Sequence, residues 1–189
     1  MESRSIDTTN DAVTFLREQH ARIRELFDQV QRAGDRGERE DRFRELRRLL
    51  AVHETAEEEI VHPRARREVD NGAAIVDARL AEENQAKIQL ADLESIDAGS
   101  VEFDVRLGKL REAVLAHAEH EEREEFAQLH AELDPGELNR MRKAVEFAEA
   151  TAPTRPHPGV ESATANMLAG PFASMLDRVK DAISAAGKS

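Results

Sequence analysis

The chain of 189 residues contains no cysteine, tryptophan or tyrosine. Without cysteine it cannot form disulfides, thiolate zinc sites or iron–sulfur clusters, so nitrogen and oxygen atoms must hold any bound metal. Glycine and proline are scarce before residue 150, and no apolar run approaches the roughly 20 residues that a membrane span needs. The N-terminal sequence also lacks the apolar core of a signal peptide. We therefore expect a cytoplasmic protein without a membrane partner.

The charge balance is strongly acidic. The 39 acidic residues outnumber the 27 basic residues, and the formal net charge is -12. Such a charge repels the phosphates of nucleic acids, so nucleic acid is excluded as an expected partner. A charged fraction of 35% beside 40% hydrophobic residues, with long runs of Ala, Glu, Leu and Arg, is typical of a mostly helical protein.

Apolar residues recur every three or four positions along four long segments, as in amphipathic helices. The first helix is expected to begin after an N-cap at Thr9 or Asn10 and to end before Gly34. The next three are expected over about 38–67, 73–96 and 101–133, followed by a fifth that starts at Pro135 and ends near residue 150. Short connections between long helices predict an all-α fold, an antiparallel up-down-up-down four-helix bundle over residues 8–150 with additional C-terminal helices.

The C-terminal part has a different composition. Three prolines between Thr151 and Gly159 predict an extended connector. Phe172, Leu176, Val179 and Ile183 then follow at helical spacing. Residues 151–189 are thus expected to form a connector and an amphipathic helix that packs on the bundle of a monomer or a homodimer.

The apolar stripes of the four long helices turn polar halfway along. In the second helix Leu46, Leu50, His53, Glu57 and Ile60 are spaced by 4, 3, 4 and 3 residues, so a histidine and a glutamate lie on the buried face. The other helices repeat this feature at similar heights. The residues expected at one level of the bundle are His20, His53, Glu57, Glu83, His117 and Glu121.

Physical chemistry favours a metal among these side chains. Buried carboxylates without partners cost several kcal/mol, and several close together repel one another. Lys87 is the main basic residue on the stripes. A pair of metal ions supplies the missing positive charge and binds imidazole and carboxylate directly. A polar, water-filled layer or a set of salt bridges among Glu, His and Arg is the alternative interpretation.

Three motifs resemble those of hemerythrin-like, HHE cation-binding proteins: "EQHARIRELFD" at 18–28, "HETAEEEIVHP" at 53–63 and "HAEHEEREEF" at 117–126. The resemblance covers about residues 10–150. It implies a four-helix bundle with two iron ions, Fe2+ or Fe3+, joined by an oxo or hydroxo bridge, with manganese or zinc as alternative metals. It also implies that His20, His53 and His117 are terminal ligands and that Glu57 and Glu121 bridge the metals.

The third helix departs from the family pattern. Where the family usually shows Glu-His, this sequence reads "AEENQAKIQL", with Glu83 at the place expected for the histidine and Asn84 beside it. An anionic carboxylate stabilises ferric iron more than imidazole does. The resemblance and this ligand balance together predict redox handling of H2O2, O2 or NO, including catalase-like chemistry, over reversible O2 carriage. An iron or oxygen sensor, a metal-binding module without turnover and a metal-free helical interaction protein are the alternatives.

The remaining polar residues receive simpler interpretations. The secondary candidate ligands are His120, Glu54, Asn84 and His157. Glu58, Glu122 and Glu125 are interpreted as solvated carboxylates or as hydrogen-bond partners of the ligands. His62 comes nine residues after His53, which places it on the opposite face of a regular helix and predicts a surface or packing role.

Other motifs do not fit their families. His130 is interpreted as structural. The "HETAE" segment lacks the second histidine of a zinc protease. A ferritin-like bundle needs two Glu-x-x-His pairs, and Glu59 with His62 is the only one expected, away from the stripe.

Overall fold

The computed structural model describes residues 11–152, which are entirely helical and connecting segments, with no strand among them. The elements in chain order are α1 (Ala12–Arg32), α2 (Arg36–Ala56), η2 (Glu57–Val61), α3 (His62–Glu68), α4 (Gly72–Glu94), α5 (Val101–His120), η3 (Glu121–Phe126), α6 (Ala127–Glu132) and α7 (Pro135–Thr151). The predicted C-terminal connector and last helix lie outside the described residues and stay a prediction.

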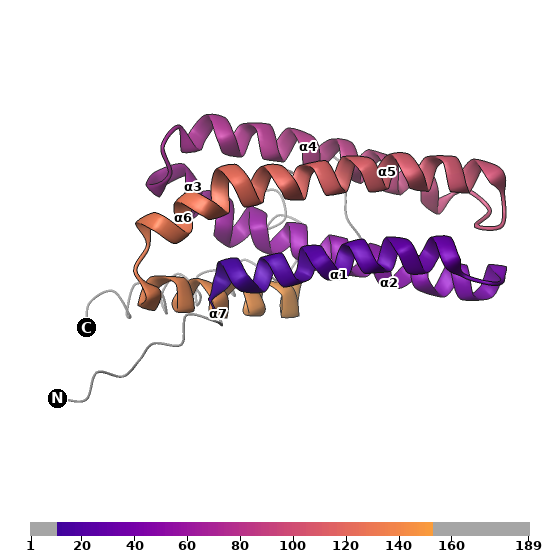
Figure 1. Ribbon diagram of the computed structural model, residues 1–189, viewed down its shortest axis with the longest axis horizontal. Helices are drawn as coiled ribbons and strands as arrows, with labels where there is room; N and C mark the ends of the chain where they lie inside the picture. Colours follow the sequence, from indigo (N-terminus) through magenta and orange to yellow (C-terminus); the bar gives the residue numbers. More distant parts are fainter. Residues whose placement is uncertain (1–10, 153–189) are drawn as a thin grey trace.

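Four long helical rods form the predicted antiparallel bundle (Figure 1). The second rod runs through α2, η2 and α3 without a break, and the fourth runs through α5, η3 and α6. The main contacts between neighbouring rods join α1 to α2 and α4 to α5, while α7 packs against α1 and α2 at one end of the bundle. The all-α bundle predicted from the sequence is confirmed, and α7 is an additional helix beyond the four.

Side-chain caps fix the starts of four helices. The N-cap of α1 is Asp11, whose carboxylate accepts a hydrogen bond from the Thr14 backbone N–H at 2.8 Å, so the predicted caps at Thr9 or Asn10 are wrong by one or two residues. Asp35 and Ser100 cap α2 and α5 in the same way. Asp134 forms a full capping box with Glu137, and Pro135 occupies the first turn of α7 as predicted.

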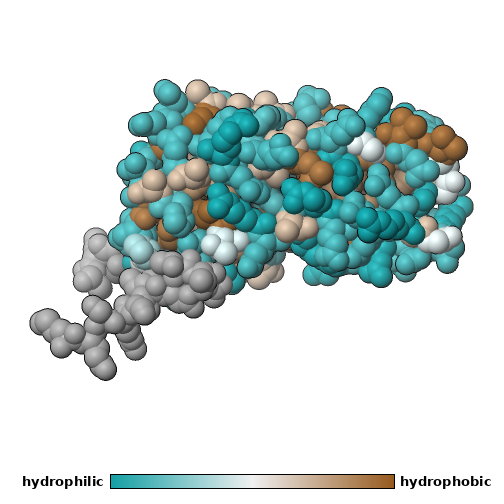
Figure 2. Space-filling model, viewed as in Figure 1, coloured by the Kyte–Doolittle hydropathy of each residue, from teal (hydrophilic) through white to brown (hydrophobic). Residues whose placement is uncertain are grey.

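The hydrophobic core is divided into two clusters along the bundle axis. One cluster contains Leu16, Val61, Phe126 and Leu129 near α7. The other contains residues such as Phe27 and Leu107 toward the far end of the bundle. On α1, His20 lies between Leu16 of the first cluster and Ile23 of the second. The polar residues of the stripes therefore lie between two apolar layers, and the face of the described residues seen in Figure 2 is mostly hydrophilic.

Gly72 and Gly108 give a matched pair of stability predictions. A Cβ at Gly72, the first residue of α4, would overlap the backbone carbonyl of Ala65, whereas a Cβ at Gly108 in α5 meets nothing within 4 Å. We expect Gly72→Ala to lower the free energy of unfolding by about 1–3 kcal/mol. Gly108→Ala should raise it by about 0.5–1 kcal/mol, because alanine loses less entropy in a helix. Urea titrations followed by circular dichroism measure both, and a stable Gly72→Ala protein would contradict the close packing of α3 on α4.

Candidate metal centre

Two π-helical segments interrupt the rods that carry the paired His and Glu residues. Segment η2 begins at Glu57, four residues after His53, and η3 begins at Glu121, four residues after His117. At the end of η2 the backbone N–H of His62 donates to the carbonyl of Glu57, five residues back instead of four. Each segment thus contains a widened turn that changes which later residues face the interior.

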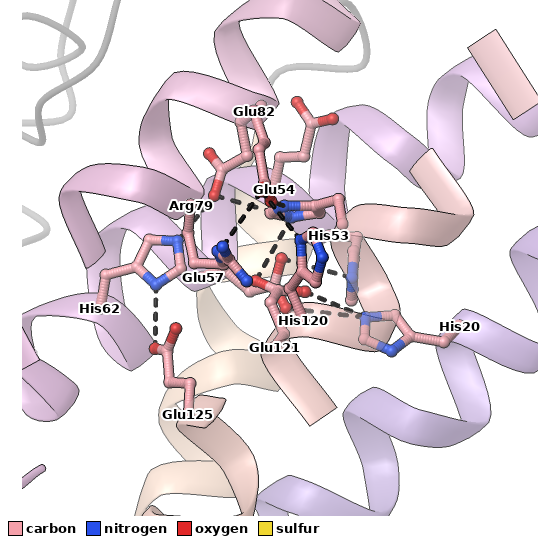
Figure 3. A network of polar contacts seen from close by, with 12 residues as sticks. His20, His53, Glu54, Glu57, His62, Arg79, Glu82, His120, Glu121 and Glu125 are labelled. Atoms are coloured by element: carbon pink, nitrogen blue, oxygen red, sulfur yellow. Dashed lines mark hydrogen bonds and ion pairs between the residues drawn. The ribbon is translucent and has the colours of Figure 1, made fainter. Parts of the chain in front are cut away.

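The first group of candidate ligands joins α1, α2 and both π-helical segments. One ligand atom each from His20, His53, Glu57 and Glu121 lies within 4.8 Å of the others, and all four side chains are buried. His53 Nε2 lies 3.3 Å from Glu57 Oε2, and His20 Nε2 lies 3.4 Å from Glu121 Oε2. The group offers two imidazole nitrogens and two carboxylates to one centre (Figure 3).

The second group uses the same two glutamates from the other side. It consists of Glu57, Glu83, His117 and Glu121, again within 4.8 Å of one another and buried. Glu121 turns Oε1 toward His117 Nε2 at 3.3 Å, while its Oε2 faces His20. Because a carboxylate with one oxygen toward each group can bind two ions at once, Glu121 has the arrangement of a bridging ligand.

A hydrogen bond behind each of the three histidines fixes the orientation of its ring. The Nδ1 atom of His20 contacts Glu122 Oε1 at 2.9 Å. The Nδ1 atom of His53 contacts Gln19 Oε1 at 2.7 Å, and that of His117 contacts Glu82 Oε2 at 3.0 Å. Since the oxygen acceptors hold Nδ1 in its protonated form, the Nε2 atoms are left to face the two groups, as is usual for histidines that bind metals.

Buried atoms without hydrogen-bond partners test whether these residues fit a metal. Both carboxylate oxygens of Glu57 and of Glu121 are buried without such a partner, and so are Nε2 of His20 and of His117. Unpaired buried polar atoms are costly, and their convergence on one place needs a cause. A pair of cations would satisfy them, so the donor set fits two metal ions bound by nitrogen and oxygen.

The two glutamates shared by the ligand groups have shifted pKa values. Burial, followed by the charge of Glu121, raises the pKa of Glu57 well above its usual value. Burial also opposes ionisation of Glu121, but the nearby His117 and His20 outweigh it and hold the pKa of Glu121 well below its usual value. The pKa values of the two shared carboxylates are therefore shifted in opposite directions, as expected for two negative groups held close together.

Lys87 lies on the α4 side of the centre, as the sequence predicted. Its Nζ contacts Glu58 directly and lies 3.7 Å from Glu83 Oε2 and 3.9 Å from Glu54 Oε2. Arg79 is also buried but pairs with Glu82 and Glu124. Arg79 is thus paired with none of the carboxylates buried at the centre, which are Glu54, Glu57, Glu58, Glu83, Glu121 and Glu125. In the salt-bridge interpretation, the remaining counter-charge comes from His20, His62 and His117, whose pKa values the neighbouring carboxylates raise against the lowering effect of burial.

The structure brings together all six main candidates of the sequence analysis, which form the two groups described above. Neither of these two groups contains a secondary candidate from the described residues. Glu54 is buried and faces Lys87, Asn84 is half-buried on α4, and His120 is 36% exposed with its Nδ1 on Glu82 Oε1 at 2.9 Å. His157 lies outside the described residues. His130 is largely exposed and lies 3.5 Å from the capping residue Asp11.

The predicted position of His62 is wrong. His62 is 2% exposed and lies within the cluster, with Glu121 and Glu125 as near neighbours. At about 100° per residue, nine residues of regular α-helix turn His62 away from His53. The residue absorbed in η2 removes about 100° of that rotation and leaves the two side chains about 80° apart. The surface interpretation therefore failed because the helix is not regular.

Of the two interpretations of Glu125, a solvated carboxylate or a hydrogen-bond partner of the ligands, the structure contradicts the first. Glu125 is fully buried rather than solvated, because η3 adds a residue between His117 and Glu125. Glu54 and Glu58 are buried as well, whereas Glu122 keeps 35% of its side chain exposed behind His20. One signal for the first π-helical segment was present in the sequence: Pro63 lacks an N–H and its ring clashes with the carbonyl four residues earlier, which a widened turn relieves. No comparable signal marks η3.

Comparisons with known proteins identify the fold and the family. The model of the "Hemerythrin HHE cation binding domain" family matches residues 11–129. The crystal structure of a hemerythrin HHE cation binding domain-containing protein from Mycobacterium kansasii superposes with a TM-score of 0.66 at 21% identity, covering 74% of this chain and 85% of that one. At this identity the structural likeness establishes the fold alone.

A curated relative is more distant in architecture. A DNA nickase from Nostoc sp. is 27% identical over 135 residues, which cover 71% of this chain but only 37% of the relative. Most of the Nostoc protein thus has no counterpart here. None of the described helices is long and apolar enough to cross a membrane. The match over residues 11–129, together with the bundle and its buried His and Glu groups, shows that the chain belongs to the hemerythrin HHE cation-binding family.

Proposed function

We propose that this protein holds two iron ions and reacts with peroxide, O2 or NO, with catalase-like turnover of peroxide as the favoured activity. The observation that supports the proposal is the sharing of Glu57 and Glu121 by the two ligand groups. His20 and His53 would complete the first site, and His117 and Glu83 would complete the second. A pair of iron ions, when bound, supplies the redox chemistry that none of these side chains has.

The balance of ligands supports peroxide handling over reversible O2 carriage. The two groups contain three histidines and three glutamates, and α4 contributes the carboxylate of Glu83 where imidazole was expected. Anionic ligands favour ferric iron, whereas an O2 carrier must keep its ferrous form. The acidic partners Glu122 and Glu82 behind His20 and His117 act in the same direction, because they make the imidazoles better donors to a ferric ion.

The surrounding chain orients the ligands and excludes water. Phe126 stacks on the ring of His20, with ring centroids 5.6 Å apart and planes inclined by 14°. The hydrogen bond from His53 to Gln19 and the two apolar clusters hold the ligands from the remaining directions. A small, uncharged reactant such as H2O2, O2 or NO suits a site enclosed in this way.

Reconstitution with ferrous iron tests the proposal. We expect two iron ions per chain by elemental analysis and a near-ultraviolet absorption that changes when peroxide is added. A protein that retains less than one iron per chain would overturn the proposal. Iron content below one ion per chain is the result expected for a metal-free interaction protein. A sensor or a binding module should instead show full iron content without peroxide turnover.

Variants then separate turnover from binding. His53→Ala and Glu57→Ala each remove a buried ligand group, so peroxide turnover per chain should fall by more than about tenfold. His130→Ala is the matched control, since His130 is exposed and lies outside both groups. Oxygen release from peroxide, recorded with an electrode, measures the three variants side by side. Equal turnover in wild type and Glu57→Ala would count against catalysis at this centre.

A further inference from the structure

His62 is a fourth buried histidine at the centre, and neither ligand group of four contains it. It begins α3, directly after the widened turn of η2. Its Nε2 lies 2.6 Å from Glu83 Oε1. Its Nδ1 lies 3.0 Å from Glu125 Oε1, a contact that Figure 3 shows. Both ring nitrogens are thus directed at carboxylates in the interior of the bundle.

The orientation of His62 repeats that of the three candidate ligands. In each of His20, His53 and His117, Nδ1 contacts a side-chain oxygen and Nε2 faces the carboxylates at the centre. His62 has the same arrangement, with Glu125 in the outer position and Glu83 in the inner one. In contrast, His120 uses its Nδ1 to bond Glu82 while remaining partly exposed. The pattern groups His62 with the ligands rather than with the surface histidines.

The second ligand group has fewer histidines than the first. It contains only one imidazole, that of His117, whereas the first group contains two. The Nε2 atom of His62 is next to Glu83 Oε1, which itself lies 4.0 Å from His117 Nε2. Two ligand atoms that are each about 2.1 Å from one ion, at a right angle, lie about 3 Å apart. The His62 and Glu83 atoms are therefore close enough to share an ion.

We propose that His62 binds, through Nε2, the same metal ion as Glu83 and His117, and that Glu125 positions it by accepting the Nδ1–H hydrogen bond. This inference rests on the proposed metal-binding function and adds a ligand to it. His62 then takes the place of the imidazole that α4 lacks, and each metal site has two histidines. The two π-helical segments serve one purpose, since η2 turns His62 inward and η3 turns Glu125 toward it.

The full-length protein loaded with cobalt(II) tests the proposal without reference to activity. A histidine bound to cobalt through Nε2 keeps its Nδ1 proton, which gives a strongly shifted, exchangeable proton resonance in water. We expect four such resonances from the wild type with two cobalt ions bound. His62→Gln should lose one of them, and the matched control His120→Gln should keep all four.

The outcomes distinguish this inference from the function on which it rests. Two bound cobalt ions with only three shifted resonances in the wild type would overturn the role of His62 and leave the metal centre intact. A wild-type protein that binds neither cobalt nor iron would overturn both. The wild-type count decides even if His62→Gln fails to fold. Glu125→Gln adds a second check, because it should displace one resonance of the four, and a spectrum without any displaced resonance would contradict the positioning role of Glu125.

Discussion

Glu121→Gln should reduce iron binding from two ions per chain to one or fewer. The two oxygens of Glu121 face different histidines, Oε2 toward His20 at 3.4 Å and Oε1 toward His117 at 3.3 Å. Glutamine has the same shape but only one oxygen, and its NH2 end cannot bind a cation. Whichever way the amide is turned, one of the two ions loses a ligand and both lose a negative charge. Elemental analysis after gel filtration measures the iron content.

The matched control for this prediction is Glu119→Gln. Glu119 lies two residues earlier on α5 and is exposed, so its substitution makes the same chemical change outside the centre. We expect two iron ions per chain in this variant. Full iron occupancy in Glu121→Gln would mean that Glu121 does not bridge, and the sharing of ligands between the two groups would have to be abandoned.

Metal binding should raise the unfolding temperature of the wild type by roughly 8–16 °C. A ligand present at about a thousand times its dissociation constant stabilises the folded state by about 4 kcal/mol, and for a domain of this size each kcal/mol raises the unfolding temperature by about 2–4 °C. The physical source is the group of buried carboxylates that Lys87 and Arg79 do not balance. Differential scanning calorimetry with ferrous iron under anaerobic conditions, and with chelator, measures the difference.

Glu57→Gln separates the effect of the metal from that of the fold. Burial raises the pKa of Glu57 in the folded protein, so the metal-free wild type loses stability as the pH rises above the unfolded value of about 4.5. Glutamine cannot ionise and is free of this loss. We expect metal-free Glu57→Gln to be more stable than metal-free wild type at pH 8, yet to gain much less from iron. An equal gain from iron in both proteins would contradict ligation by Glu57.

The sequence predicted the bundle because its signals are local. Apolar spacing marked the four rods, and Pro135 marked the start of α7. The same spacing led to six polar residues that the structure brings together between two apolar clusters. Their role as ligands stays a prediction, but their convergence follows from helical geometry, since residues three or four apart share a face.

His62 and Glu125 were missed because regular periodicity was assumed to continue to the end of each rod. A π-helical turn depends on the packing of the whole bundle, and the glutamates that dominate "EEEIV" and "EEREEF" have a high intrinsic preference for a regular α-helix. The N-cap at Asp11 was missed for a simpler reason, because Thr9, Asn10 and Asp11 are all good capping residues. Which of them caps the helix is decided by packing, and Asp11 is 2% exposed in the folded protein.

The helices that pack against the second rod change at its widened turn. Before it, α2 packs on α1 and α7; after it, α3 packs on α4 and α6. A straight α-helix of this sequence would turn His62 away from His53, whereas the surplus residue absorbed in η2 keeps the buried side continuous from α2 into α3. Deleting one residue from η2 would remove the widened turn, but His62 would stay about 80° from His53 because eight regular residues would then span the same rotation, so α3 is expected to keep its neighbours.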